Sequence, residues 1–267
     1  MHALIPLVVT TALAALHVSS VKDRNALTLP AQRHLVRVET GDGRPAAWLL
    51  AVQMSGDGGR GLELLRSDDD AQTWRPYAPI QPDFTHQDRA DLHVIGRDLV
   101  MVWSFEDPIV TGSSRHDVSF QRWRFDEVTA DWRPDPAVPV FDARSDDVAY
   151  IRGELARDSL GRIWVQAWRL ERNGRYTAVL SVSEDEGRTF VEQKPLDSLP
   201  ERGGGRIIAT GGLLVVLYDM HHDSSRPARM RVRRDGWPLA AWAPAEDACP
   251  GGIYHGAALS AVDDGAG

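Results

Sequence analysis

The sequence predicts an all-β fold, a β-propeller of four-stranded antiparallel blades, and two regularities in the 267-residue chain lead to this prediction. The first is an eight-residue motif that recurs at a fixed spacing. The second is a pair of short apolar strands that precedes each copy of the motif, in phase with it. No stretch after residue 20 has the apolar period of a helix, so strands are expected throughout.

The recurring motif reads Ser-x-Asp-x-Gly-x-Thr-aromatic, and its two clear copies begin at Ser67 and Ser183. Alanine replaces the glycine in the first copy. The copies are 183 − 67 = 116 residues apart, and half of that distance, 58, predicts a hidden copy at 67 + 58 = 125. Residues 125–132 keep an acid at the third place, Glu127, and an aromatic residue at the last, Trp132. The spacing therefore indicates three successive copies of one structural unit.

Each unit begins with a short alternating strand, a turn with Gly or Asp, and a stronger apolar strand rich in Val, Leu, Ile and Trp. A third strand follows and ends in the motif, and a fourth is opened by residues such as Arg75-Pro76 or Arg133-Pro134. Four antiparallel strands in about 50 to 60 residues are typical of a propeller blade. The expected strand pairs are 35–38 with 47–52, 92–95 with 99–103, 154–156 with 163–168, and 207–209 with 213–218.

The motif at this position resembles the Asp box of the bacterial-neuraminidase repeat, which occurs in sialidases and in many other propellers. The resemblance covers nearly all of the chain after about residue 30. It implies that the Ser and Asp side chains accept backbone N–H groups in the turn between strands three and four. Glycine permits the left-handed bend of this turn, and the aromatic residue packs between blades. The box predicts the fold and does not by itself specify an activity.

The expected domain organisation is a propeller over residues 21–267, preceded by residues 1–20 as a signal peptide or an apolar strand. Blades are expected to start near residues 32, 88, 150 and 203, and residues 254–267 read as the first strand and turn of a fifth. Sialidase-type propellers have six blades, so the resemblance implies a domain that is incomplete at its C-terminus. The apolar run 3–16 is too short to span a bilayer. Cleavage after it would place the protein outside the cell or in the periplasm, and otherwise in the cytoplasm.

Composition limits the partners that the chain can have. The net charge of −8, without a Lys/Arg block, argues against nucleic acid. The single cysteine, Cys249, cannot form an internal disulfide and has no metal-ligand spacing around it, so we predict neither a metal nor a cofactor. The sequence leaves the oligomeric state open.

Three arginines are the leading candidates for substrate binding. In an up-and-down blade, the link into strand one and the turn between strands two and three share one face, which is the face that propeller ligands normally approach. Arg89, Arg152 and Arg206 each lie near the start of the innermost strand in successive blades. A guanidinium group can hold a carboxylate with paired hydrogen bonds. The three positions resemble the pattern of sialidases, which use three arginines to hold the carboxylate of the sugar. We therefore expect an acidic carbohydrate ligand.

Catalytic residues are assigned by the same resemblance. A glycosidase needs a general acid and a second group with opposite pKa tuning. Asp88 or Asp91 is the expected acid, and Glu154 with Tyr254 is the expected carboxylate and phenol of a nucleophile pair. Further substrate-binding candidates on the same loops are His86, His221 and His255. The Phe/Tyr-Arg-Ile-Pro motif expected near the start of a sialidase domain is absent from the chain.

The predicted function is that of a glycoside hydrolase that acts on, or binds, an acidic glycan. Two alternatives remain open at this point. The His-rich loops, together with His93 and Tyr218, also suit a polysaccharide lyase, which removes a proton beside a uronate carboxylate while arginine neutralises that carboxylate. The second alternative is a non-catalytic glycan-binding or scaffold propeller, because Asp boxes also occur in such proteins.

Overall fold

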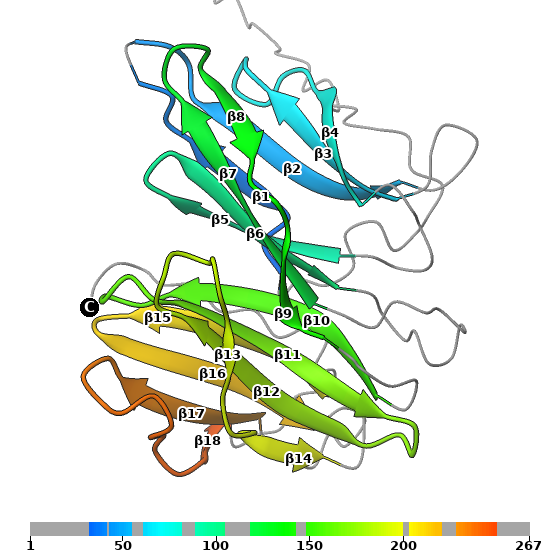
Figure 1. Ribbon diagram of the computed structural model, residues 1–267, viewed down its shortest axis with the longest axis vertical. Helices are drawn as coiled ribbons and strands as arrows, with labels where there is room; N and C mark the ends of the chain where they lie inside the picture. The colour runs from blue at the N-terminus through cyan, green and yellow to red at the C-terminus, as the bar shows by residue number, and fades with distance from the viewer. Residues whose placement is uncertain are drawn as a thin grey trace, which may run out of the picture.

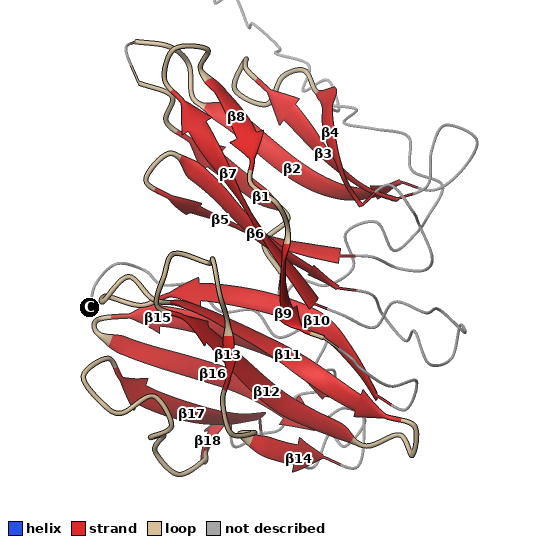
Figure 2. Cartoon of the chain, viewed as in Figure 1, coloured by secondary structure: helices blue, strands red, loops and turns tan. Residues whose placement is uncertain are grey.

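The computed structural model describes residues 32–41, 43–54, 61–81, 89–104, 118–142, 148–199, 203–220 and 228–249. Within these ranges all regular structure is β-strand, as Figure 2 shows. The described residues accordingly include no helix that is long and apolar enough to cross a membrane. The predicted fifth unit, residues 254–267, lies outside these ranges, as does the segment 1–20.

The strands form four antiparallel sheets, and the strands of each sheet are consecutive in the chain. The first sheet contains β1 (Leu35–Val38), β2 (Ala47–Met54), β3 (Gly61–Ser67) and β4 (Arg75–Gln81). The second contains β5 (Arg89–Ile95), β6 (Asp98–Ser104), β7 (Val118–Asp126), β8 (Asp131–Pro134) and β9 (Val138–Phe141). These sheets correspond to the first two predicted blades.

The third and fourth sheets repeat the pattern. The third contains β10 (Val148–Arg157), β11 (Ile163–Glu171), β12 (Tyr176–Ser183), β13 (Val191–Glu192) and β14 (Asp197–Leu199). The fourth contains β15 (Gly203–Thr210), β16 (Leu213–Met220), β17 (Ala228–Arg234) and β18 (Glu246–Cys249). The all-β prediction of four-stranded antiparallel units is confirmed, with one difference. In the second and third sheets the outermost strand is interrupted, so that β8 and β9 both pair with β7, and β13 and β14 both pair with β12.

Figure 1 shows the first sheet at the top, the second sheet below it, and the third and fourth sheets overlapping in the lower half of the view. The first strands of the sheets lie together, because β10 contacts both β5 and β15, and β1 contacts β5. Three apolar clusters fill the spaces between neighbouring sheets. The largest buried side chains, Trp164 and Trp168, lie between the third and fourth sheets. Every residue of β12 is buried, as expected for a strand covered on both faces.

The two clear Asp boxes have the same hydrogen bonds. Ser67 Oγ accepts the N–H of residue 71 at 3.0 Å, and Ser183 Oγ accepts the N–H of residue 187 at 2.8 Å. Asp69 and Asp185 each accept the backbone N–H and the hydroxyl of the box threonine. Hydrogen bonds to the threonine lower the pKa of both carboxyl groups to about 2. The boxes therefore fix the turn between strands three and four, as predicted.

The hidden copy at 125–132 also forms the turn between strands three and four, but with a shorter connection and a different acid. The sequence placed the acid at Glu127, but this residue is exposed and pairs with Arg97 at 3.2 Å. Asp126 takes its place and accepts the N–H groups of residues 128 and 129 at 2.9 and 3.3 Å. The 58-residue spacing was therefore right about the turn and wrong by one position about the acid.

The aromatic residues that close the boxes follow the same turn in three sheets. Trp132 lies edge-on to Tyr77 of the first sheet, with ring centroids 6.4 Å apart. Phe190 lies 5.2 Å from Phe120 of the second sheet. Trp74 instead packs on a small apolar cluster of its own sheet. Two of the three aromatics thus pack between sheets, as expected.

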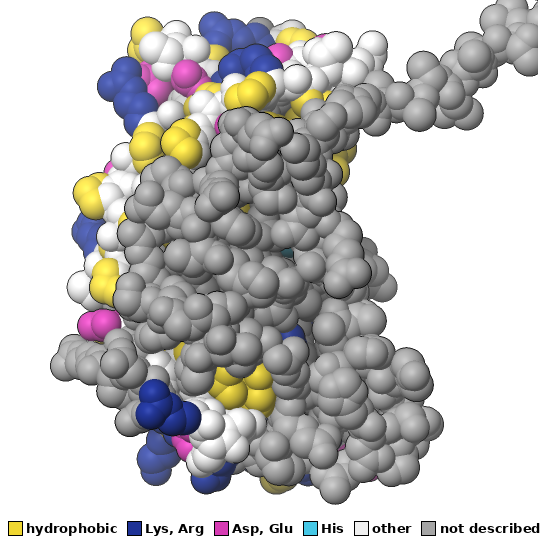
Figure 3. All heavy atoms as spheres, turned by 90° about the vertical axis from the view of Figure 1, so that its right-hand side faces the viewer, with side chains coloured by type: hydrophobic (Ala, Val, Ile, Leu, Met, Phe, Trp, Pro, Cys, Tyr) yellow, Lys and Arg dark blue, Asp and Glu magenta, His cyan; other side chains and the backbone are white. Residues whose placement is uncertain are grey.

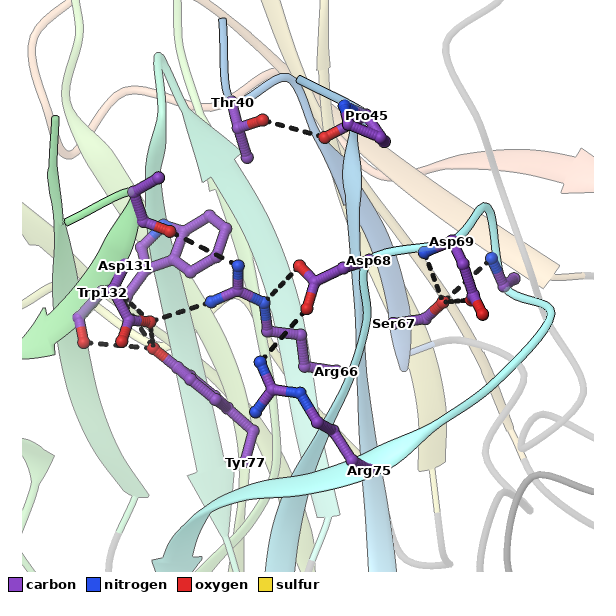
Figure 4. Close-up of polar contacts among 12 residues, drawn as sticks. Thr40, Pro45, Arg66, Ser67, Asp68, Asp69, Arg75, Tyr77, Asp131 and Trp132 are labelled. Atoms are coloured by element: carbon purple, nitrogen blue, oxygen red, sulfur yellow. Dashed lines mark hydrogen bonds and ion pairs between the residues drawn. The ribbon is translucent and has the colours of Figure 1, made fainter.

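Arginines reinforce each contact between neighbouring sheets at the box end. Figure 4 shows Arg66 of the first sheet between Asp68 and Asp131, the latter from the second sheet at 2.9 Å. The same guanidinium lies over the ring of Trp132 at 5.1 Å. The second and third sheets are joined by the Arg122–Glu186 ion pair at 3.1 Å. The third and fourth sheets are joined by Arg162, which donates to the backbone carbonyl of Asp235 at 2.8 Å. An arginine therefore makes a polar contact across each of the three interfaces.

The glycine of the third box allows a stability prediction. A Cβ on Gly187 would lie 2.2 Å from Phe120 Cε1, and the residue has φ +91°. Gly174, in the hairpin between β11 and β12, has φ +84° but nothing within 4 Å. We expect Gly174→Ala to show only the backbone cost of about 1–2 kcal/mol. Gly187→Ala should lose about 1–3 kcal/mol more in urea unfolding, because Phe120 is buried and must move. Equal losses would show that the contact is relaxed.

Candidate functional site

Charged and polar side chains from the segment before β1 and from the second, third and fourth sheets meet where the innermost strands approach one another. Arg33 lies just before β1, Asp91 and His93 belong to β5, Glu154 belongs to β10, and Arg206 belongs to β15. We call these five residues the axial cluster. Of the site residues that the sequence predicts, it brings together Asp91, Glu154 and Arg206.

Asp91 is the centre of the axial cluster. Its side chain is completely buried, and its oxygens accept the backbone N–H of Arg33 at 2.6 Å and that of Leu155 at 2.8 Å. The guanidinium groups of Arg33 and Arg206 each donate to it at 3.1 Å. Burial by itself would raise the pKa of Asp91, but the two arginines outweigh it and hold the pKa far below its usual range. Asp91 is thus a carboxylate at neutral pH, a state that does not fit the expected general acid.

Arg206 is committed to this ion pair rather than directed at solvent. Its side chain is 4% exposed, and the pair with Asp91 spans the second and fourth sheets. Burial opposes its charge, yet Asp91 and Glu154 together raise the pKa of Arg206. The sequence predicted Arg206 as a ligand for a sugar carboxylate, whereas the structure gives it a carboxylate of the protein itself.

Arg33 is a component of the cluster that the sequence analysis missed. Its Nη2 donates to the Leu155 carbonyl at 2.6 Å, and its Nη1 lies 2.7 Å from His93 Nδ1. It therefore connects the start of the first sheet with the second and third sheets. The 58-residue register could have found it, because 33 + 58 = 91 places Arg33 one blade before Asp91. Its side chain is 32% exposed, which makes it an accessible cation of the cluster.

His93 is a neutral hydrogen-bond donor in this arrangement. Burial, followed by the nearby charge of Arg33, lowers the pKa of His93 to about 4. Because a guanidinium can only donate, Nδ1 must be the acceptor of the contact with Arg33, and the proton of the neutral ring is assigned to Nε2. His93 therefore presents an N–H group and not a free basic nitrogen.

The pKa of Glu154 is shifted upward, in the opposite direction to that of Asp91. The residue is 3% exposed, and burial raises its pKa to about 8 although Arg206 acts in the other direction. One side-chain oxygen accepts the N–H of Ile207 at 3.3 Å. Glu154 is thus protonated at neutral pH beside a carboxylate that is ionised. Such a divided pair of carboxyl groups is the pattern found in general acid–base sites.

Arg152 occupies a strained position next to Glu154. The pairing of β10 with β11 shifts between Ile151 and Glu154, and Arg152 has φ +57° within this bulge. Gly153 is held from both sides, since its N–H donates to Ser104 Oγ at 3.0 Å and its carbonyl accepts from Gln32 Nε2 at 2.8 Å. A left-handed, buried, non-glycine residue on an inner strand is a position that the surrounding structure must enforce.

The remaining site candidates lie in or beside the loops outside the described residues. These are Asp88, Tyr254, His86, His221 and His255. Arg89 begins β5 and pairs with Ser104, but its side chain is outside the described part. Their predicted roles stay predictions. Among the residues that are described, no three His, Cys, Asp or Glu side chains gather as a metal site requires.

The direction of the chain predicts that ligands approach the face where second strands such as β2 and β11 end. This face lies on the right of Figure 1 and is turned toward the viewer in Figure 3. Side chains of Lys and Arg are visible toward the top and the bottom of this view. Asp and Glu side chains lie among them, so the described residues at these ends carry charges of both signs.

Comparison with solved structures identifies the fold. No model of a known protein family matches the chain, and no curated protein matches it. An ulvan lyase of polysaccharide lyase family PL25 matches with a TM-score of 0.53 and 13% identity, over 76% of this chain and 52% of the lyase. The GH93 α-L-arabinofuranosidase of Fusarium graminearum matches with a TM-score of 0.53 and 10% identity, over 83% of this chain and 65% of that enzyme.

A third similar structure is the sialidase of Trypanosoma rangeli, with a TM-score of 0.51 and 14% identity. The match covers 80% of this chain and 38% of the sialidase. The chain thus spans less than two thirds of the length of each of these structures. It has the propeller fold that sialidases, arabinofuranosidases and ulvan lyases share, and at these identities the similarity shows the fold alone.

Removal of the charge of Asp91 should weaken the whole fold. We expect Asp91→Asn to lower the free energy of unfolding by about 3–5 kcal/mol, because Arg206 would remain buried without its carboxylate. Urea unfolding at neutral pH is the measurement, with Glu39→Gln as control, since the Arg37–Glu39 pair is exposed. The loss should be smaller in an Arg206→Met background. Additive losses in the double variant would contradict a direct pair.

The raised pKa of Glu154 predicts a pH dependence of stability. Between the unfolded pKa near 4.5 and the folded pKa of about 8, the folded chain holds a proton that the unfolded chain releases. The stabilisation is therefore complete below pH 4.5 and is lost as the pH rises, by up to about 1.4 kcal/mol per pH unit. Glu154→Gln should remove this decline in unfolding series between pH 5 and pH 8. A parallel decline in the variant would assign it to another group.

Proposed function

We propose that this propeller binds an acidic glycan at the axial cluster and hydrolyses it, with Glu154 as the proton donor. The observation that carries the proposal is the divided pair of carboxyl groups, Asp91 ionised and Glu154 protonated, at the meeting point of the innermost strands. General acid catalysis at neutral pH needs a carboxyl group with a raised pKa. The propeller fold of glycan-active enzymes supports the same proposal.

The charge of the axial cluster supports an anionic ligand. Arg33 and Arg206 contribute two positive charges, and Asp91 contributes one negative charge while Glu154 is protonated. The partly exposed guanidinium of Arg33 makes part of this charge accessible. A carboxylate on the ligand would offset the excess charge and gain charge-assisted hydrogen bonds. Arg152, two residues before Glu154, is proposed to complete the carboxylate site together with Arg89.

The proposed reaction uses Glu154 as an acid and recovers its proton from water. Glu154 donates its proton to the glycosidic oxygen as the bond to the anomeric carbon breaks, and water supplies the hydroxyl group and the replacement proton. The hydrogen bonds around Asp91 leave it a poor nucleophile, because five N–H donors already stabilise its charge. The attacking group is therefore proposed to come from the site-side loops, with Tyr254 or Asp88 as candidates. The sequence predicted Glu154 as the carboxylate partner of Tyr254 in a nucleophile pair, whereas the proposal assigns it as the general acid.

The lyase alternative is less well supported by the described residues. Proton abstraction beside a uronate carboxylate needs a basic nitrogen or a phenolate. His93 cannot supply the base without losing its contact with Arg33, because its acceptor nitrogen is occupied. A non-catalytic binding propeller remains the second alternative. It differs from the proposal in that binding and not turnover would be its only activity.

Turnover tests Glu154 directly. We expect Glu154→Gln to reduce kcat on an acidic glycan about 10²- to 10⁴-fold while binding persists, because the amide keeps the shape of the side chain but has no acidic proton to donate. Release of reducing sugar from sialosides and from uronate polymers is the measurement, with Glu127→Gln, an exposed acid at the box end, as control. Wild-type kcat should fall as the pH rises through about 8, since the acid then loses its proton. Unchanged turnover in Glu154→Gln would refute the assignment, and an unsaturated uronate product would favour the lyase.

Arginine variants test the acidic ligand separately from the chemistry. Arg152→Gln should weaken glycan binding about ten- to a hundred-fold, which corresponds to about 1.5–3 kcal/mol for a charge-assisted hydrogen bond. Arg75→Gln is the control, because Arg75 is 57% exposed and lies at the box end of the first sheet. Calorimetric titration with sialosides and uronate oligomers measures the difference. Equal affinities of the two variants would remove the support for a carboxylate site.

A further inference from the structure

A cavity lies away from the axial cluster, at the box end of the second and third sheets. Its volume is about 280 Å³. One wall is formed by β7, another by the connection between β8 and β9, and a third by the Asp-box turn of the third sheet, residues 186–188. We call it the box-side cavity. None of its lining residues belongs to the axial cluster.

The cavity exists because the outermost strand of the second sheet is interrupted. Between β8 and β9 the chain leaves β7 for residues 135–137. Asp135 holds this connection in place, since its N–H donates to the Arg122 carbonyl at 2.8 Å and its carbonyl accepts from Gln121 Nε2 at 2.8 Å. Pro136 has no N–H to continue the pairing. The recess beside β7 is thus built by backbone geometry.

Gly187 allows the Asp-box turn of the third sheet to lie close against β7 of the second sheet. Its position in the box places the backbone of the third sheet directly against Phe120, where a Cβ would lie only 2.2 Å from the ring. Phe120 is among the lining residues but is 1% exposed. Pro136 and Val138 are the more accessible apolar residues of the lining. These two residues therefore offer an apolar surface to the body of a ligand.

Three arginines line the box-side cavity, and they differ in how many of their donors are already paired with acids of the protein. Arg122 is 12% exposed and lies between Asp98 at 2.6 Å and Glu186 at 3.1 Å. Arg124 donates only its Nε, to Asp135 at 2.9 Å, which leaves both Nη groups unused among the described residues. The exposed guanidinium of Arg188 has no hydrogen bond or ion pair within the described part of the chain. The lining thus carries three arginines against two acids, Asp135 and Glu186, and the outer donors of Arg124 and Arg188 are available to the carboxylate of a ligand.

From these features we propose that the box-side cavity binds a carboxylate-bearing monosaccharide ring. The carboxylate is received by Arg124 and Arg188, and a C–H face of the ring lies on Val138 and Pro136. The volume is just below the range typical of drug-sized ligands, so a single sugar ring fits better than an oligomer. This site goes beyond the proposed function and does not depend on it, because it lies on other residues and needs no catalytic group.

The test is calorimetric titration of the full chain with glucuronate, and with glucose as the neutral match. We expect glucuronate to bind and glucose to bind at least tenfold more weakly, because the carboxylate supplies the charged acceptors. Arg124→Gln and Arg188→Gln should each weaken glucuronate binding about tenfold. Arg234→Gln, an exposed arginine of β17, is the matched control and should not change it. Equal binding of glucose, or unchanged affinity in both variants, would overturn the proposal.

Two further variants separate this cavity from the axial cluster. Val138→Trp fills the cavity and leaves the arginines in place, so it should abolish glucuronate binding at the cavity, with the urea midpoint as a check of folding. Arg152→Gln lies in β10, outside the cavity, and should leave that binding intact. Loss of all glucuronate binding in Arg152→Gln would refute the cavity site and assign the ligand to the axial cluster. Persistence of all binding in a folded Val138→Trp variant would also refute it.

Discussion

The carboxylate of Asp91 is the interaction on which the axis of this propeller depends. It is fully buried and receives donors from Arg33 before the first sheet, from the backbone of β10 in the third, and from Arg206 in the fourth. A buried charge is stable only when it is paired and hydrogen-bonded. Asp91 therefore links the segment before β1 with the second, third and fourth sheets, and the hydrogen bonds of Gln32 and Arg33 to the backbone of β10 add to this link. The same ion network sets the electrostatics of Glu154, which stays protonated beside it.

The periphery of the molecule is organised by a different constraint, the turn between strands three and four. Each turn orients its aromatic or charged residue toward a neighbouring strand, and Arg66, Arg122 and Arg162 add one polar contact at each interface. These contacts use few buried charges, since Asp131 and Glu186 are largely exposed. Axis and periphery thus differ in chemistry. Buried ions join distant sheets at the centre, while apolar clusters and rim arginines join adjacent sheets outside it.

The interrupted outer strands show how local sequence modifies the repeat. In the second sheet, β8 ends at Pro134, Pro136 follows two residues later, and the chain returns to pair with β7 only at Val138. The second half of the strand keeps the apolar core between the sheets closed through Val140 and Phe141. The break opens the recess that the arginines of β7 line. The break between β8 and β9 thus creates the box-side cavity, while the apolar core between the second and third sheets stays closed.

The sequence by itself determined the repeat: the box residues hydrogen-bond within five positions, and apolar runs between turns define strands, so local chemistry is sufficient for both. It also placed Asp91, Glu154 and Arg206 near the axis, because each lies at a known position of an inner strand. Only the tertiary structure decided their partners. Arg206 and Asp91 are 115 residues apart, and whether an arginine meets a ligand or a carboxylate of its own chain depends on how sheets two positions apart approach. The protonation of Glu154 was decided in the same way, because it follows from burial by elements that a linear pattern does not specify.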